Sequence, residues 1–211
     1  MKKFIIILSF YFLLNLNTNL ISNEKSTKFL AVGHIYPIIN DKKRLDSLLE
    51  KMNSHNADYI FILGDSKLNE IEYFDYFKEN LKAKLYFSPG NHEVKNFKDA
   101  YEKNVGYLNK VIDHDDVRFI LLNSSDSKEN IITFLKDKVI TDKLVLILTH
   151  HRIWDDTLLS KDSYEHDKSY YFKEIYPILK NNVKAIFAGN SKRQHFRDLT
   201  DDLLTYGKQN V

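Results

Sequence analysis

The sequence predicts an α/β layered domain, in which strands and helices alternate along the chain. Short apolar runs bounded by turn residues recur throughout the 211 residues, as expected of buried strands. Apolar residues at helical spacing lie between these runs. No repeat and no linker rich in Pro, Gly or Ser divides the sequence, and its length suits one sizeable core. We therefore expect a single domain over residues 23–211, preceded by a distinct segment over residues 1–22.

The first half of the domain is predicted to alternate strand and helix. In the first helix, apolar residues recur at i, i+3, i+4 and i+7, at Leu45, Leu48, Leu49 and Met52. The predicted elements are strands over residues 28–33, 58–63 and 84–88 and helices over 41–54 and 70–81. Because strands joined by helical crossovers pair in parallel, we expect a parallel, twisted sheet with helices on its faces.

The second half continues the alternation. The predicted elements are strands over residues 117–123, 144–148 and 183–188 and helices over 129–139 and 170–179. The last segment, residues 191–211, is polar and offers at most one helix and a short strand.

The N-terminal segment has the composition of an export signal. Lys2 and Lys3 precede an apolar stretch over residues 4–14, which is too short to favour a spanning helix, and a polar segment over residues 15–26 follows. We expect an exported, periplasmic or extracellular protein. Since no A-x-A cleavage site is present, an uncleaved anchor through residues 4–14 is the alternative, and it would be the protein's one membrane contact.

Composition limits the chemistry. The sequence has no Cys, so any metal must be held by His, Asp, Asn and backbone oxygens. The formal net charge is +2 and includes Lys2 and Lys3, and the other Lys residues are interspersed with Asp and Glu. We therefore expect no dedicated nucleic-acid surface.

Polar residues follow three of the predicted strands, at the point where each strand ends. Gly64-Asp65 follows the second strand, Gly90-Asn91-His92-Glu93 lies on a predicted tight turn after the third, and His150-His151 follows residues 144–148. Because ligands bind at the carboxyl ends of parallel strands, we expect these side chains to share one crevice. Such a group of carboxylate, amide and imidazole side chains suits metal-assisted chemistry on phosphate esters.

In order and strand context, these motifs resemble those of the calcineurin-like metallophosphoesterases, which read DxH, GDxxD, GNH[E/D], H and GHxH. The first motif is present as Val32-Gly33-His34, the second as residues 64–68 without its last Asp, and the third is intact. The fourth is His150 or His151, and the last corresponds to Gly189-Asn190-Ser191-Lys192, where both histidines are replaced. The resemblance extends over residues 29–192 and single motifs are weak, so it rests on their order.

The resemblance implies a four-layer αββα sandwich, whose second sheet is completed by strands after the last motif. Only residues 191–211 follow that motif here. We therefore expect either a reduced second sheet or a chain that is incomplete at its C-terminal end.

The resemblance also implies metal ligands. The family binds two metals, and the first would keep only His34 and the bridging Asp65, because Val32 and Lys192 stand at its other ligand positions. The second would keep Asp65, Asn91 and His150.

Asn190 stands at the fourth ligand position of the second metal, where an amide oxygen can still bind a hard cation. We thus expect one or two divalent cations (Mn, Zn, Fe or Mg), and favour one, with Lys192 supplying part of the lost charge to the substrate phosphate. His92 is the candidate general acid, with Glu93 or a backbone carbonyl fixing its tautomer.

Residues 152–169 are predicted to form a loop over the site. Arg152 and Trp154 are candidate substrate contacts on it, for a phosphate and for a sugar or base, although Trp154 also suits the core. The expected substrate is a small-molecule phosphoester or a sugar phosphate.

Several alternatives stay open at this stage. Gly64-Asp65 suits a capping turn as well as a ligand, Asn190 and Lys192 suit an ordinary turn, and His151 suits the ligand position as His150 does. The main functional prediction is a phosphomonoesterase or phosphodiesterase. The alternative is a catalytically inactive descendant that serves as a binding or assembly protein of the cell envelope.

Overall fold

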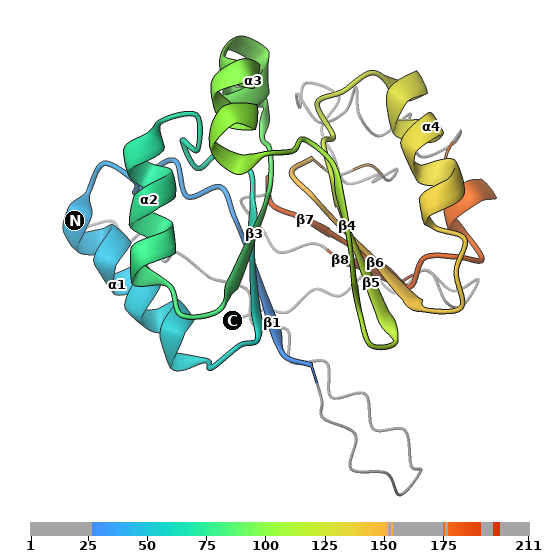
Figure 1. The fold of residues 1–211 in the computed structure, drawn as a ribbon, viewed down its shortest axis with the longest axis horizontal. Helices are drawn as coiled ribbons and strands as arrows, with labels where there is room; N and C mark the ends of the chain where they lie inside the picture. The colour runs from blue at the N-terminus through green and yellow to red at the C-terminus, as the bar shows by residue number, and fades with distance from the viewer. Residues whose placement is uncertain (1–26, 152, 154–174, 176, 191–195, 199–211) are drawn as a thin grey trace, which may run out of the picture.

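Four layers stack in the order helices, sheet, sheet, helices (Figure 1). The computed structural model describes residues 27–151, 153, 175, 177–190 and 196–198. The predicted α/β layered class and the αββα sandwich are both confirmed.

The first sheet is parallel and three-stranded, in the order β1-β2-β3. Its strands are β1 (Phe29–Gly33), β2 (Tyr59–Leu63) and β3 (Lys84–Ser88). The crossover helices α1 (Lys42–Ser54) and α2 (Ile71–Asn80) lie together on its outer face (Figure 1). These elements match the sequence prediction to within one residue at each end.

The second sheet is five-stranded, in the order β4-β5-β6-β7-β8. Its strands are β4 (Lys110–His114), β5 (Val117–Leu122), β6 (Leu144–Thr149), β7 (Ala185–Ala188) and β8 (Phe196–Asp198). The three central strands are parallel, and β4 and β8 pair antiparallel at the two edges. Helix α4 (Lys128–Lys138) covers its outer face, and Ile175 and residues 177–179 are also helical. The remainder of the predicted helix over 170–179 lies outside the described residues.

Among the described residues, the second sheet contains one strand that the sequence did not predict. This strand is β4, which forms a hairpin with β5 through Asp115 at a positive φ of 46°. With β4 included, four of the five strands precede residue 191. Of the described strands, β8 alone follows the last motif.

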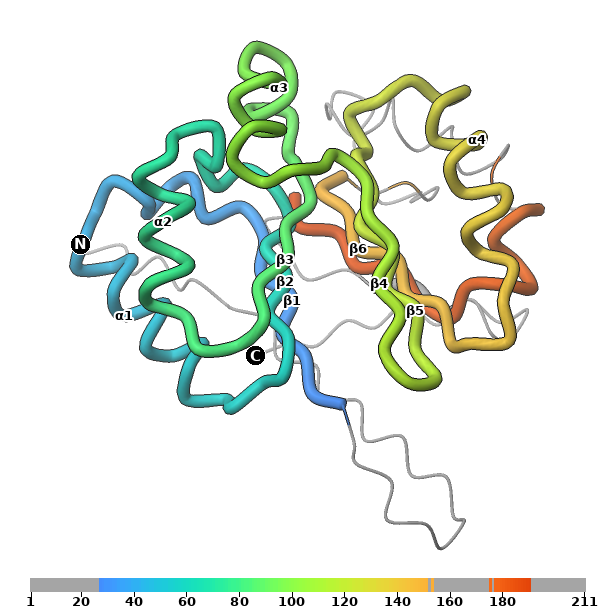
Figure 2. Tube along the Cα trace, viewed as in Figure 1, coloured from blue at the N-terminus to red at the C-terminus, as the bar shows by residue number. Residues whose placement is uncertain are grey.

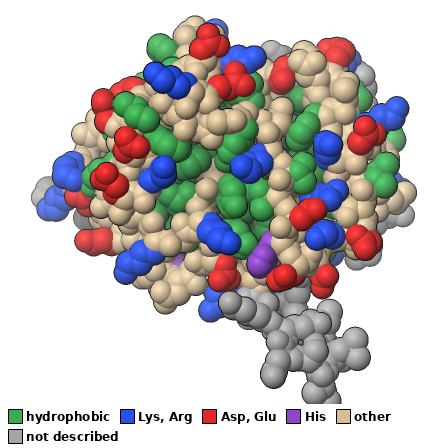
Figure 3. Space-filling view, viewed as in Figure 1, with side chains coloured by type: hydrophobic (Ala, Val, Ile, Leu, Met, Phe, Trp, Pro, Cys, Tyr) green, Lys and Arg blue, Asp and Glu red, His purple; other side chains and the backbone are tan. Residues whose placement is uncertain are grey.

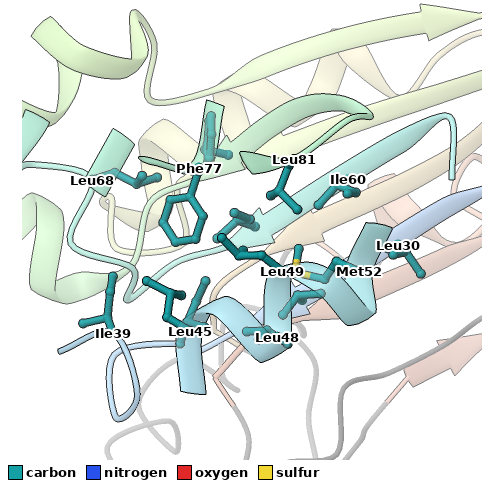
Figure 4. Close-up of a cluster of buried hydrophobic side chains, with 14 of the residues drawn as sticks. Leu30, Ile39, Leu45, Leu48, Leu49, Met52, Ile60, Leu68, Phe77 and Leu81 are labelled. Atoms are coloured by element: carbon teal, nitrogen blue, oxygen red, sulfur yellow. The ribbon is translucent and has the colours of Figure 1, made fainter. Parts of the chain in front are cut away.

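Three apolar clusters fill the three interfaces between the layers. The cluster beneath α1 and α2 contains Leu45, Met52 and Phe77 (Figure 4). The two sheets pack face to face (Figure 2). Aromatic rings fill the space between them, with the Phe61 and Phe119 centroids 4.8 Å apart. The third cluster lies between the second sheet and α4. Since β2 supplies alternate residues to two clusters, its five buried residues form a continuous apolar run.

The predicted tight turn after β3 is the first turn of a helix, α3 (Asn91–Val105). Gly90 caps its start, Gly106 ends it in the left-handed region at φ 89°, and Phe97 interrupts it at φ −134°. Only Glu93 and Tyr101 of this helix are buried. The weak apolar stripe explains why the periodicity did not identify α3.

Basic and acidic side chains are interspersed on the face drawn in Figure 3. In the part of the chain that the structure describes, no helix is both long enough and apolar enough to cross a membrane. Residues 1–26, which include the predicted export signal, lie outside that part.

Candidate metal centre

The carboxyl ends of strands from both sheets converge at one place, and glycines make this approach close. A Cβ on Gly33, at the end of β1, would lie 2.2 Å from the Cα of Gly189, which follows β7. A Cβ on Gly189 would lie 2.1 Å from the carbonyl oxygen of Leu63, at the end of β2. Both positions therefore require glycine. The loops after β2, β3 and β6 meet as expected, since a Cβ on Gly64 would lie 2.5 Å from Nδ1 of His150 and 2.7 Å from the Cα of Gly90.

Three side chains from these loops gather around one carboxylate oxygen. Oδ2 of Asp65 lies 3.2 Å from Nδ1 of His34 and 3.2 Å from Nε2 of His150. A ligand atom from each residue lies within 4.8 Å of the other two. Asp65 and His150 are buried, whereas His34 is 39% exposed, so the group is reached from the His34 side. Its donor set of two imidazoles and a carboxylate suits a divalent transition metal.

The position of the proton on the His150 ring also suits the binding of a metal at this group. Its Nδ1 lies 2.9 Å from the carbonyl oxygen of Leu63, which can only accept, so Nδ1 carries a proton. Nε2, which lies 3.2 Å from Oδ2 of Asp65, is then the nitrogen at which a cation can take the place of a proton. Nε2 of His150 and Nδ1 of His34 are both buried and lack a hydrogen-bond partner among the described residues. A cation beside the carboxylate would satisfy both nitrogens, with the Leu63 carbonyl holding the His150 ring in position.

Electrostatics keep Asp65 ionised. Burial would raise the pKa of its carboxyl, but the contacts with His150 and His34 outweigh burial and hold that pKa well below its usual range. For His150, burial would lower the pKa, but the neighbouring Asp65 outweighs burial and raises it. The centre therefore presents a buried anion to any cation that enters.

Glu93 holds the Asp65 loop. Its buried carboxylate accepts the backbone N–H groups of Asp65 (3.0 Å), Ser66 and Lys67 (3.0 Å), and that of Gly90 (2.8 Å). The expectation that Glu93 fixes the His92 tautomer is therefore wrong, because both of its oxygens bind backbone groups instead. The loop needs this support, since Asp65 and Lys67 adopt positive φ values of 51° and 56°.

Asn91 belongs to a second, adjoining chain of contacts. Its Oδ1 lies 3.2 Å from Nε2 of His151, and Nδ1 of His151 lies 3.0 Å from Oγ of Ser124. This chain is satisfied when Ser124 donates to Nδ1 and Nε2 donates to Asn91. His151 thus orients Asn91, whereas His150 contacts Asp65. The two histidines that the sequence left as alternatives for one ligand position therefore have different contacts.

His92 lies at the mouth of the site. Its backbone N–H donates to Oδ1 of Asp65 (3.3 Å), and its Nε2 lies 4.0 Å from Oδ2 of the same carboxylate. The imidazole is 53% exposed and packs beside the ring of Tyr36, with centroids 4.8 Å apart. This placement lets His92 reach both the centre and solvent.

The remaining predicted residues fall into two groups. Asn190 is near the centre, since its N–H donates to the carbonyl of His150 (2.7 Å), and Val32 is buried in the apolar cluster beneath α1. Arg152, Trp154 and Lys192 lie outside the described residues.

Sequence reasoning missed Ser124, Tyr36 and the role of Glu93. Ser124 follows β5 at the same sheet edge as the ligands, so the strand-end criterion could have found it. Glu93 belongs to the third motif, but its role, like that of Tyr36, depends on contacts between separate loops that no pattern in the sequence signals.

An αββα sandwich with His and Asp residues clustered at converging strand ends defines a metallophosphoesterase-like protein. A family model described as calcineurin-like phosphoesterase matches residues 28–189, so the chain belongs to this family. A solved structure described as "GAP50 the anchor in the inner membrane complex of Plasmodium" is similar, with a TM-score of 0.58. The similarity has 14% sequence identity and covers 85% of this chain and 70% of that chain, which shows a common fold alone. A search of curated proteins finds no match.

Proposed function

We propose that the protein is a metal-dependent phosphoester hydrolase that works with a single divalent cation. The observation that carries this proposal is the His34–Asp65–His150 group, in which two buried imidazole nitrogens without hydrogen-bond partners among the described residues face one ionised carboxylate. Mn, Zn, Fe or Mg are the candidate ions, and the ligand set of two imidazoles and one carboxylate favours the transition metals among them.

The residues around the centre would divide the work. A divalent cation held at the centre would supply Lewis-acid chemistry, stabilising the charge that develops during phosphoryl transfer. His34, Asp65 and His150 would hold this cation, and Glu93 fixes the loop that carries Asp65. His92, half exposed beside the carboxylate, donates a proton to the leaving oxygen as its bond to phosphorus breaks and water supplies the new oxygen.

A second candidate function is a catalytically inactive binding protein of the cell envelope. The observation that favours it is Val32, which stands where the family has a metal-binding Asp and is 8% exposed in an apolar cluster. A buried valine cannot bind a cation, so the first metal of the family would lose a ligand. In either case we infer an exported protein, and for the enzyme a small phosphoester or sugar phosphate as substrate.

Hydrolysis of an aryl phosphomonoester and an aryl phosphodiester, each with added Mn²⁺, Zn²⁺, Fe²⁺ or Mg²⁺, tests the proposal. We expect turnover with at least one cation, and about 10²–10⁴-fold slower turnover in His92→Ala. The matched control is His114→Ala, which removes a histidine on β4, outside the site. Cation binding without turnover of either ester would favour the binding protein, and turnover unaffected by His92→Ala would remove His92 as the acid.

A further inference from the structure

We propose that Ser124 is a positioning residue, which acts through His151 to keep the NH₂ group of Asn91 free to donate to an oxygen of the phosphoester. This inference rests on the proposed function and deepens it, because it assigns substrate recognition to a side chain of the same site. It differs from the role that the family resemblance implies for Asn91, which is that of a metal ligand through its amide oxygen.

The buried hydroxyl of Ser124 determines which nitrogen of His151 carries the proton. Its Oγ accepts the backbone N–H of His151 (2.9 Å) and lies 3.0 Å from Nδ1 of the same ring. Ser124 is fully buried, and its hydroxyl has no other partner among the described residues, so its proton finds an acceptor at Nδ1 alone. With Nδ1 as the acceptor, the proton of the neutral imidazole lies on Nε2.

The proton on Nε2 fixes the orientation of the Asn91 amide. Nε2 of His151 lies 3.2 Å from Oδ1 of Asn91, and a nitrogen that donates needs the amide oxygen at this contact, not the NH₂ group. The NH₂ group is at the other end of the planar amide and has no hydrogen-bond partner among the described residues. This half-buried side chain therefore offers two N–H donors that its described neighbours leave unused.

Asn91 lies beside the candidate metal centre. Its neighbour Gly90 is so close to the carboxylate that a Cβ there would lie 2.2 Å from Oδ1 of Asp65. Its partner His151 packs edge-on against the His150 ring, with centroids 4.7 Å apart. A donor in this place is available to the charged oxygens of a phosphoester at the centre, and an N–H donor bonds a charged oxygen more strongly than a neutral one.

Binding measurements on Asn91→Ala test the donor role without turnover. We expect the Zn²⁺ affinity to stay within about twofold of wild type, and the affinity of the zinc-loaded protein for methylphosphonate to fall about 10- to 100-fold, the range of one hydrogen bond to a charged group. The matched control is Asn96→Ala, which removes an exposed amide from the same helix. A Zn²⁺ affinity that falls tenfold or more, or an unchanged phosphonate affinity, would overturn the inference.

The tautomer of His151 tests the positioning role of Ser124. In NMR spectra of zinc-loaded protein with isotope-labelled histidine, where the His151 signals are assigned by their loss in His151→Gln, we expect the ring proton on Nε2. Ser124→Ala should abolish this preference and weaken methylphosphonate binding about 2- to 10-fold, the range of one ordinary hydrogen bond.

The matched control for this variant is Ser125→Ala, because the neighbouring Ser125 hydroxyl has no hydrogen-bond partner among the described residues. It should leave both the tautomer and the phosphonate affinity unchanged. A ring proton on Nδ1 in wild type would contradict the inference, and so would a tautomer that Ser124→Ala does not alter, since a merely structural role of the serine would leave the tautomer in place.

These measurements separate the inference from the proposed function. If no phosphate ester is hydrolysed, the proposed function fails, but methylphosphonate binding that Asn91→Ala weakens, together with the Nε2 tautomer, would still support the inference. If the wild type binds no zinc, the same phosphonate titration of the metal-free protein decides it. A wild type that binds no methylphosphonate would overturn the inference even where it holds zinc.

Discussion

At the residue scale, Gly64 determines where the His150 ring can lie. Gly64 has a φ of 73°, and a Cβ there would lie 2.5 Å from Nδ1 of His150 and 2.7 Å from the Cα of Gly90. The glycine thus provides both the left-handed turn before Asp65 and the space for the histidine.

Substituting this glycine should disrupt the centre. We predict that Gly64→Ala destabilises the protein by about 1–2 kcal/mol for the left-handed backbone and about 1–3 kcal/mol more for the clash. Gly106→Ala is the matched control, because Gly106 has a φ of 89° but nothing within 4 Å of its Cβ. Urea unfolding of both variants measures the difference, and equal losses of stability would mean that the His150 ring moves aside without cost.

Also at the residue scale, Glu93 should stabilise the fold through its backbone contacts. We predict that Glu93→Gln lowers the free energy of unfolding by about 1.5–3 kcal/mol, since an amide NH₂ would face backbone N–H groups that now meet a carboxylate. The variant should also bind the cation more weakly, because Asp65 loses its support. Glu102→Gln, on the exposed side of the same helix, is the control. An unchanged midpoint in urea would contradict this role.

At the scale of elements, the end of α3 is tied to the edge of the first sheet. Oη of Tyr107, just after α3, accepts the backbone N–H of Phe87 in β3 (3.1 Å). This hydrogen bond pairs one backbone N–H of an edge strand. Unpaired backbone groups on such a strand would otherwise allow another chain to pair with the sheet. Burial raises the pKa of Tyr107 to about 12.

Tyr107→Phe tests this tie. We predict a loss of about 1 kcal/mol of stability at neutral pH, because the Phe87 N–H loses its acceptor. The raised folded-state pKa means that the neutral phenol is favoured in the folded protein, so its contribution is complete below pH 10 and is lost as pH rises to about 12. The difference in unfolding free energy between wild type and Tyr107→Phe should therefore shrink as the pH is raised across that range. A constant difference would show that the phenol is not buried.

Elements with strong apolar periodicity were predictable from the sequence. Strands β1, β2, β3, β5 and β6 and helices α1, α2 and α4 were found with nearly their true bounds, because each has a face buried in one of the three clusters. Helix α3 and strand β4 were missed, since each buries few side chains. Their formation depends on tertiary contacts, such as the binding of Glu93 to the Asp65 loop.

At the scale of the whole molecule, the centre depends on two sheets that meet at their carboxyl ends. His34 and Asp65 come from the first sheet and His150 from the second, so the group exists only when the sheets pack together through Phe61 and Phe119. The order of motifs could predict that these residues converge. It could not predict which nitrogen of each histidine faces the carboxylate, because that depends on the Leu63 carbonyl and on the angles between loops.

The central claim is that His34, Asp65 and His150 hold one divalent cation. Its most direct test is elemental analysis of the purified protein after loading with Mn²⁺ or Zn²⁺ and exhaustive dialysis, for wild type, Asp65→Asn and His114→Ala. We predict about one equivalent of metal in wild type and His114→Ala and a near-complete loss in Asp65→Asn, with all three folded by circular dichroism. Wild type without metal, or Asp65→Asn with as much metal as wild type, would contradict the claim.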